Sequence, residues 1–271
     1  MPKHFGKCAL CGNKCELTFE HIPPRSAFNA SPAKPVTGEG MLKDDRMPWD
    51  TTGLPYKNQQ QGMGKYTLCQ TCNNNTGSWY GEDYRIVARV VHSILSEPMD
   101  PQYQAFGIRD IHPLRFIKQV LSMFCSINNF EDERIDILRK FVIDKDAVGL
   151  DKKKYKVCMY LTKSKLMKYA PLSVVLRIGE TKCESLALTE ITAYPLGFVV
   201  YFDPTDTFHY DGFDITHFSD CRYDDVADIQ MPFCIYEMND IFPTYYRSQE
   251  EIKQCVENNK ERNEDNEPND N

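Results

Sequence analysis

Two CxxC pairs separated by a long stretch of chain constrain this sequence more than any other feature. Cys8-Ala9-Leu10-Cys11 and Cys69-Gln70-Thr71-Cys72 can each direct two sulfur atoms toward one point. Together they supply the four thiolates of a tetrahedral structural zinc site. Such a site has no open position for a substrate, so it would stabilise the fold without taking part in catalysis. We therefore predict one Zn²⁺ on these four cysteines, with Cys15 as a fifth candidate that could replace Cys8 or Cys11.

The remaining cysteines and the start of the chain favour metal binding over disulfide bonding. The chain has 11 cysteines, an odd number, and its first residues lack the apolar core of a secretory signal. Cysteines in such a context are expected as metal ligands or buried thiols. No apolar stretch reaches the roughly 18 residues that a transmembrane helix needs. We therefore expect a cytoplasmic protein with no membrane partner.

The charge of the chain changes sign along its length. The net charge of −7 argues against a nucleic-acid partner if it is taken as a whole. Residues 1–90, however, contain 11 Lys and Arg against 8 Asp and Glu, and the excess of acid lies in the rest of the chain. The basic part coincides with the CxxC pairs. The overall acidity therefore does not exclude DNA as a partner of the N-terminal region.

The pattern of apolar residues predicts helices first and strands later. Apolar residues repeat at helical spacing over 81–97 and 112–128, and a third helix follows with Asn128 and Asn129 as its caps. From about residue 155 the period changes to two, which predicts an antiparallel β-rich part. The strands are expected at 155–162, 172–179, 185–193, 196–203, 213–219 and 228–237. The fold class is therefore α+β.

Composition divides the chain into three parts. Residues 1–97 contain the CxxC pairs and, between them, a long inserted loop at 29–64 that is rich in Pro, Gly, Asn and Gln. Residues 98–255 are expected to form an α+β domain, which could bind a protein partner or a second copy of the chain. Residues 256–271 have almost nothing to bury, and we expect them to be a disordered acidic tail.

The string Glu20-His21-Ile22-Pro23-Pro24 carries the most chemistry in the chain. Two prolines after a carboxylate and a histidine are typical of a strand that stops abruptly and exposes polar side chains at its end. A neutral imidazole can accept a proton from water at physiological pH. A carboxylate and an amide oxygen can hold a hard divalent ion that stabilises charge on a phosphate. The pair therefore predicts a general base beside a metal ligand.

These motifs together resemble the HNH (ββα-metal) endonuclease superfamily, in the branch whose hairpin is stapled by a four-cysteine zinc. The resembling residues are Cys8-x-x-Cys11, Leu17-Thr18-Phe19-Glu20-His21-Ile22-Pro23-Pro24 and Leu68-Cys69-x-x-Cys72-Asn73-Asn74-x-x-Gly77. The resemblance covers about residues 5–85. It implies an N-terminal zinc-bound ββα-metal unit, followed by a helical segment and the antiparallel β-rich C-terminal domain. It also implies a hydrolase that cuts phosphodiester bonds of DNA, with RNA not excluded.

The resemblance assigns roles to individual residues. His21 would be the general base, and Glu20 and Asn73 would bind a catalytic Mg²⁺ or Mn²⁺, with Asn74 as the alternative to Asn73. Asn73 could instead serve only as a helix cap. Arg25, just after the prolines, could reach a phosphate oxygen.

Two positions depart from the family pattern. The Asn that orients the base, expected about five residues before the third cysteine, is absent, and Asn58, Gln59, Gln60 or Gln61 could substitute for it. Thr76 stands at the position where this family often has a lysine. The favoured hypothesis is a DNA endonuclease, in the context of defence against phage or foreign DNA. The alternative is a catalytically inactive, zinc-stabilised module that binds nucleic acid or protein.

Overall fold

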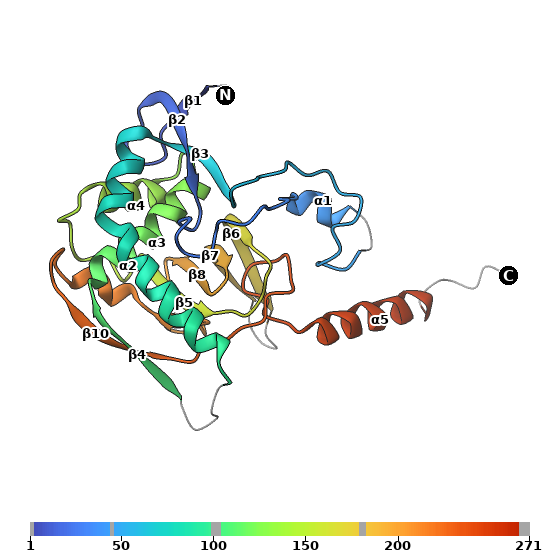
Figure 1. Ribbon diagram of the computed structural model, residues 1–271. Coiled ribbons are helices and arrows are strands. Elements are labelled where there is room, and N and C mark those ends of the chain that lie inside the picture. Colours follow the sequence, from blue (N-terminus) through green and yellow to red (C-terminus); the bar gives the residue numbers. More distant parts are fainter. Residues whose placement is uncertain (1–2, 44–45, 99–103, 179–182, 266–271) are drawn as a thin grey trace.

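The structure of the protein is a computed structural model that describes residues 3–43, 46–98, 104–178 and 183–265. Mixed helices and antiparallel sheets make an α+β fold (Figure 1). The N-terminal part is a three-stranded antiparallel sheet of β1 (His4–Lys7), β2 (Lys14–His21) and β3 (Gly64–Cys69), with β2 in the middle. Helix α2 (Gln70–Ser96) continues directly from β3. Cys69 pairs with Leu17 and His21 pairs with Gly64, so α2 must turn back along β2 to approach its end, and Asn73 in the first helical turn contacts β2 at Thr18 and Phe19.

The predicted insertion between β2 and β3 is a long loop, and the short helix α1 (Gly38–Leu42) is the only helix among its described residues, 22–43 and 46–63. Its two ends are joined by the buried Asn29. The Asn29 side chain donates to the carbonyl groups of Pro23 and Met63, each at 2.7 Å, and accepts from the Met63 N–H. Figure 1 shows that the loop projects from the body of the molecule. The loop therefore leaves the sheet and returns to it at a fixed place beside His21.

Helix α3 (Pro113–Ile127) lies at the centre of the fold. Every residue of α3 except Arg115 is buried, because α2, α4 (Glu133–Ile143) and strands of two sheets surround it. A helix that is covered on all sides is normally apolar all round. This helix instead buries several polar residues, which matter for the site described below: Lys118, Gln119, Ser122 and Ser126.

The second half of the chain forms a five-stranded antiparallel sheet in the order β6-β7-β8-β5-β9. Its strands are β5 (Tyr155–Leu161), β6 (Lys168–Ile178), β7 (Cys183–Ala193), β8 (Leu196–Phe202) and β9 (Phe213–Asp214). A separate ribbon pairs β4 (Ala105–Ile111) with β10 (Ala227–Pro232). The buried side chain of Asn128 joins α3 to the larger sheet by donating to Thr189 and accepting from Leu172 N–H.

The structure corrects several sequence predictions. The helix expected over 81–97 begins at Gln70, so the asparagine triplet lies inside it. Asp132, and not Asn128 or Asn129, caps α4. The strand expected over 213–219 is only the two-residue β9, followed by a 3₁₀ helix (Thr216–Asp220). Strand β4 was not predicted, because residues 105–111 lack a clear alternation.

Part of the segment predicted to be a disordered tail is helical. Residues 256–265 continue helix α5 (Gln249–Asp265), which extends away from the body in Figure 1. Ser248 and Glu251 form a capping box at its start, with Glu251 accepting from Ser248 N–H and Ser248 Oγ accepting from Glu251 N–H. The buried Ile252 anchors the first turn. Residues 266–271 lie outside the described residues.

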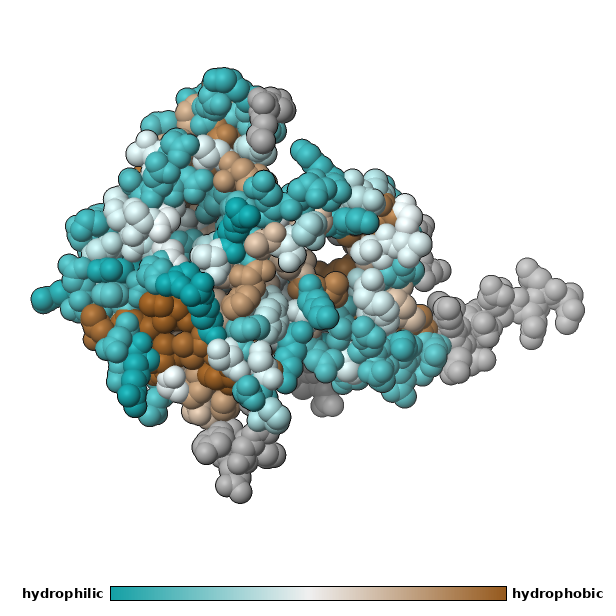
Figure 2. Space-filling view, viewed as in Figure 1, coloured by the Kyte–Doolittle hydropathy of each residue, from teal (hydrophilic) through white to brown (hydrophobic). Residues whose placement is uncertain are grey.

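A hydrophobic core runs through both halves of the molecule. The larger of the two clusters of buried side chains extends from Cys8 to Met231 and includes residues on both sides of the boundary predicted near residue 97. Most of the face shown in Figure 2 is hydrophilic, with apolar residues gathered over the region of β4 and β10. Among the described residues, no helix combines the length and the hydropathy that a membrane span requires.

Gly197 allows β8 to pass close to the ring of Tyr160. A Cβ atom at Gly197 would lie 2.0 Å from Tyr160 Cζ, whereas a Cβ at Gly77 in α2 would meet nothing within 4 Å. We expect Gly197→Ala to lower the free energy of unfolding by roughly 1–3 kcal/mol through overpacking. Gly77→Ala should raise it by about 1 kcal/mol through helix propensity. Urea denaturation of both variants measures the difference, and equal stabilities would contradict the packing described for β8.

Candidate functional site

Two backbone turns bring the four predicted zinc ligands together. Residues 8–13 form the turn between β1 and β2, in which Cys8 N–H donates to Asn13 and Gly12 N–H donates to Cys8. Gly12 has a φ of 74°, a left-handed conformation that suits glycine. Cys69 ends β3 and caps α2, and Cys72 lies in the first helical turn. As a result, the Sγ atoms of Cys8, Cys11, Cys69 and Cys72 all lie within 4.8 Å of one another.

The chemistry of this cluster fits zinc. Cys8 accepts a hydrogen bond from the Cys72 thiol and another from Cys69 N–H, and the first of these is the main reason why the pKa of Cys8 is lowered to about 4. The pKa of Cys72 is raised, because the Cys72 thiol is the donor of this hydrogen bond to the Cys8 sulfur. The cluster therefore favours a thiolate, which is the form that binds Zn²⁺. Cys15 is not part of the cluster, and its thiol contacts the carbonyl of Asn13.

His21 is held in one orientation by the inserted loop. Its Nε2 lies 2.9 Å from the carbonyl oxygen of Gln61. A carbonyl can only accept, so Nε2 carries the proton and Nδ1 retains a lone pair. Partial burial lowers the pKa of His21, and the charge of Arg25 adds to this effect. The imidazole is therefore neutral near physiological pH, with a basic nitrogen that has no hydrogen-bond partner among the described residues.

Glu20 is a buried carboxylate beside His21. Only 5 % of the residue is exposed, and its Oε2 accepts hydrogen bonds from Ser126 Oγ at 2.5 Å and Thr67 Oγ1 at 3.3 Å. Burial raises the pKa of Glu20 to about 7, against the lowering effect of these hydrogen bonds. Within the part of the chain that the structure describes, Oε1 has no hydrogen-bond partner. The ionised group is therefore destabilised, and a cation bound to it would relieve that cost.

Asn73 reaches back from α2 to β2. Its amide nitrogen donates to Thr18 Oγ1 at 2.9 Å and to the Phe19 carbonyl at 3.3 Å, which leaves its oxygen available as an acceptor or ligand. The helix is capped by Cys69, whose sulfur accepts from Cys72 N–H, so the interpretation of Asn73 as the helix cap is wrong. Asn74 is exposed and accepts from Gln70. The alternative role for Asn74 therefore has no support from its position.

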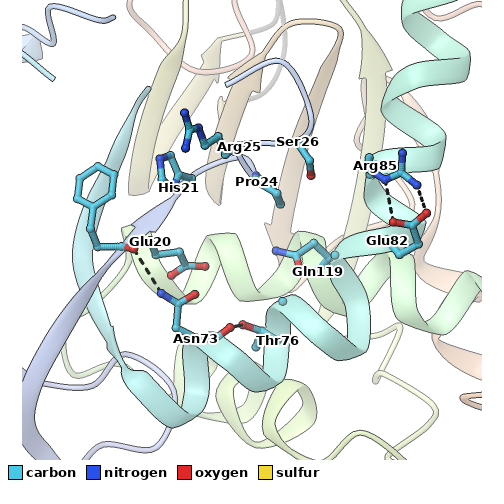
Figure 3. Close-up of a pocket in the computed structure, with 13 residues that line it drawn as sticks. Glu20, His21, Pro24, Arg25, Ser26, Asn73, Thr76, Glu82, Arg85 and Gln119 are labelled. Carbon is cyan, nitrogen blue, oxygen red and sulfur yellow. Dashed lines mark hydrogen bonds and ion pairs between the residues drawn. The ribbon is translucent and has the colours of Figure 1, made fainter. Parts of the chain in front are cut away.

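The residues that the sequence singles out line a single pocket of about 470 Å³. Glu20, His21, Arg25 and Asn73 all contribute to its wall, whereas Asn74 does not. In Figure 3, Glu20 and His21 lie at the end of β2, and Asn73 lies below them at the start of α2. Thr76, the residue in the place of a frequent lysine, also lines the pocket, and its hydroxyl donates to the carbonyl of Cys72. The pocket therefore combines an imidazole, oxygen donors and a cationic side chain.

Helix α3 contributes residues that the sequence analysis missed. Ser126 donates to Glu20, and Gln119 lines the pocket wall. The signal was a row of polar residues, Gln119, Ser122 and Ser126, spaced by three and four positions in a helix that is otherwise apolar. A polar row on an amphipathic helix is normally exposed, so this pattern did not predict that these residues lie beside the site.

Known proteins offer no guide to this arrangement. Protein-family models, curated proteins and solved structures were all compared with the chain, and none of them matches it. The function is therefore argued from the side chains in the pocket and from the cysteine cluster beside it.

Replacing one zinc ligand should remove the metal and destabilise the N-terminal sheet. We expect about one zinc per chain in the wild type, and loss of that zinc in Cys69→Ser, because structural zinc contributes directly to folding. Cys15→Ser is the matched control, since Cys15 lies near the cluster but outside it. Native mass spectrometry and thermal unfolding measure both effects. Full zinc content in Cys69→Ser would show that the ligands are different.

The raised pKa of Glu20 should make stability depend on pH. The folded state holds the Glu20 proton more tightly than the unfolded state, so the stabilisation is complete below about pH 4.5 and is lost as pH rises through about 7. We expect wild-type stability to fall between pH 5 and pH 8 by on the order of 2 kcal/mol more than that of Glu20→Gln. Urea unfolding without added divalent cation tests this. Parallel pH profiles would contradict the burial of a titrating carboxyl.

Proposed function

We propose that this chain is a metal-dependent endonuclease of the HNH type that hydrolyses phosphodiester bonds of DNA, with His21 as the general base. The observation that carries the proposal is the position of His21. One ring nitrogen is anchored to Gln61, the other has a free lone pair, and two oxygen ligands, Glu20 and Asn73, line the same pocket. A base and a cation site that face one pocket are what hydrolysis of a phosphodiester requires.

The proposed chemistry begins with a water molecule beside His21. Nδ1 takes a proton from this water, and the water oxygen forms a bond to phosphorus while the bond to the leaving oxygen breaks. The Nε2–H bond to the Gln61 carbonyl keeps the ring in the required tautomer and stabilises the imidazolium that forms. Gln61 therefore takes the place of the missing middle residue, through its backbone and not through its side chain.

The cation site would be built from Glu20 and Asn73. A carboxylate oxygen and an amide oxygen are hard donors that suit Mg²⁺ or Mn²⁺. The hydrogen bonds from Ser126 and Thr67 fix the Glu20 carboxylate, and those to Thr18 and Phe19 turn the Asn73 amide so that its oxygen is free. When bound, the ion would supply charge stabilisation to the phosphate and the leaving oxygen.

Arg25 supports the binding of a phosphate at the mouth of the pocket. The residue is exposed and lines the pocket beside His21. A guanidinium group can donate two parallel hydrogen bonds to phosphate oxygens. Its positive charge also favours the neutral form of His21. The local charge at the mouth therefore suits DNA, although the chain as a whole is acidic, and defence against foreign DNA remains the context that we propose for this activity.

A plasmid assay tests the proposal directly. We expect the purified protein to nick or cut plasmid DNA when Mg²⁺ or Mn²⁺ is added, and His21→Ala to lose at least a hundredfold in rate because it lacks the base. His209→Ala is the control, since His209 is an exposed histidine that does not line the pocket. The cation is best omitted and restored rather than chelated, because a chelator would also compete for zinc.

The pH profile of the same reaction gives a second readout. Activity should fall on the acidic side with an apparent pKa below 6.5, because burial lowers the pKa of His21 and only the neutral ring acts as a base. Equal cutting by the wild type and His21→Ala would remove the mechanism. No cutting by either, with DNA binding retained, would favour the inactive binding module.

A further inference from the structure

The pocket extends beyond the proposed cation site into a slot between α2 and α3. On the α2 side its wall includes Gly77 and Gly81, which lie one helical turn apart and have no side chains. A Cβ atom at Gly77 would meet nothing within 4 Å, and one at Gly81 would meet only Gln119 Oε1, at 4.0 Å. Glycine inside a helix costs about 1 kcal/mol relative to alanine. Together they leave a bare strip on the helix, which is open at Gly77 and lies close to Gln119 at Gly81.

Gln119 faces this strip from α3. Only 3 % of the residue is exposed, and it lines the pocket together with Gly77 and Gly81. Its Oε1 is buried and has no hydrogen-bond partner among the described residues. Figure 3 shows its side chain between α2 and the end of β2, in the same pocket as Glu20. A buried acceptor without a partner is costly, so an amide that turned this oxygen toward a donor in the pocket would gain a hydrogen bond.

The slot and the proposed cation site belong to opposite ends of one pocket. Ser126, two turns after Gln119 on α3, donates to Glu20, and the two residues lie on the same face of the helix. Arg85 lines the pocket near the slot and is held by an ion pair with Glu82. A ligand that spans the pocket would therefore meet oxygen donors and His21 at one end and an amide at the other.

We infer that the slot binds one unpaired nucleobase of the DNA strand whose phosphate lies at His21, an inference that rests on the proposed function. A base is flat and could lie over the open space at Gly77, with its edge toward Gln119. Its edge offers adjacent donor and acceptor groups, and an amide can pair with both. The pocket volume of about 470 Å³ is that of a site for a small molecule. The slot lies between two helices of the protein, where a base stacked in a duplex cannot enter, so the nucleotide enters unpaired.

Metal-free binding of a mononucleotide tests the slot without any catalysis. The probes are deoxyadenosine 5′-monophosphate and 2-deoxyribose 5-phosphate, titrated by NMR without added divalent cation. We expect the nucleotide to bind the wild type at least tenfold more tightly than the sugar phosphate. Gln119→Met should abolish this preference, because it keeps the volume and removes the amide. Gln230→Met, at an exposed glutamine of β10 outside the pocket, should keep it.

One further variant and two outcomes complete the test. Gly81→Leu fills the slot from the α2 side and should also abolish the preference for the nucleotide over the sugar phosphate. The inference can therefore still be tested if Gln119→Met fails to fold. Equal binding of the two probes to the wild type would overturn it, since the slot would then hold water only. A preference that survives both Gln119→Met and Gly81→Leu would place the base elsewhere and overturn it equally.

A cleavage assay separates failure of the slot from failure of the nuclease. The substrates are a single-stranded oligonucleotide, the same strand in a duplex, and the single strand with one abasic position. We expect the single strand to be cut at least tenfold faster than the duplex, with cutting at the abasic position reduced. An undiminished cutting rate at the abasic position would contradict base binding in the slot but would still support the nuclease. A base preference in binding, with no cutting at all, would overturn the nuclease and leave the slot.

Discussion

The meeting of two cysteine turns is the constraint on which the rest of the site depends. The sheet β1-β2-β3 has three strands, and it buries Leu17 and Leu68 in the main core while Phe5 of β1 is largely exposed. The cluster of Cys8, Cys11, Cys69 and Cys72 joins the first turn of this sheet to the start of α2. A zinc ion on these sulfurs would fix how β2 lies against α2. That relation decides whether His21, at the far end of β2, faces the same pocket as Asn73.

The site is completed by parts of the chain that lie outside the cysteine-bound unit. Gln61, from the inserted loop, orients His21, and Asn29 holds the ends of that loop together. Ser126, from the central helix α3, binds Glu20, and Tyr169 in β6 donates to the carbonyl of Ile22. The C-terminal half therefore supports the pocket physically.

The sequence predicts the parts of this site that depend on local chemistry. The CxxC spacing identified the four sulfurs, and the Glu-His-x-Pro-Pro string identified the end of a strand, because both patterns work over a few residues. The strands β5 to β8 followed from alternation. Gln119 and Ser126 could not be placed, because their contacts depend on how α3 packs, which no local pattern encodes. The start of α2 was missed because local preference pointed the wrong way: three asparagines in a row are poor helix formers. A tertiary contact, that of Asn73 with β2, helps to hold this segment in the helix.

The burial of Glu20 connects the two ends of the pocket energetically. Burial raises the pKa of Glu20, which is 5 % exposed, to about 7, so a proton would compete with the proposed cation for this carboxylate. The α3 face that donates to Glu20 through Ser126 also contains Gln119, whose Oε1 has no hydrogen-bond partner in the described part of the chain, at the other end of the pocket. A DNA strand that fills the slot would exclude water from the pocket and lower the local dielectric constant. A lower dielectric constant penalises an ionised Glu20 without a partner and strengthens the attraction of this carboxylate to a cation. Binding of the strand and of the ion should therefore favour each other, with α3 as the rigid element that both contact.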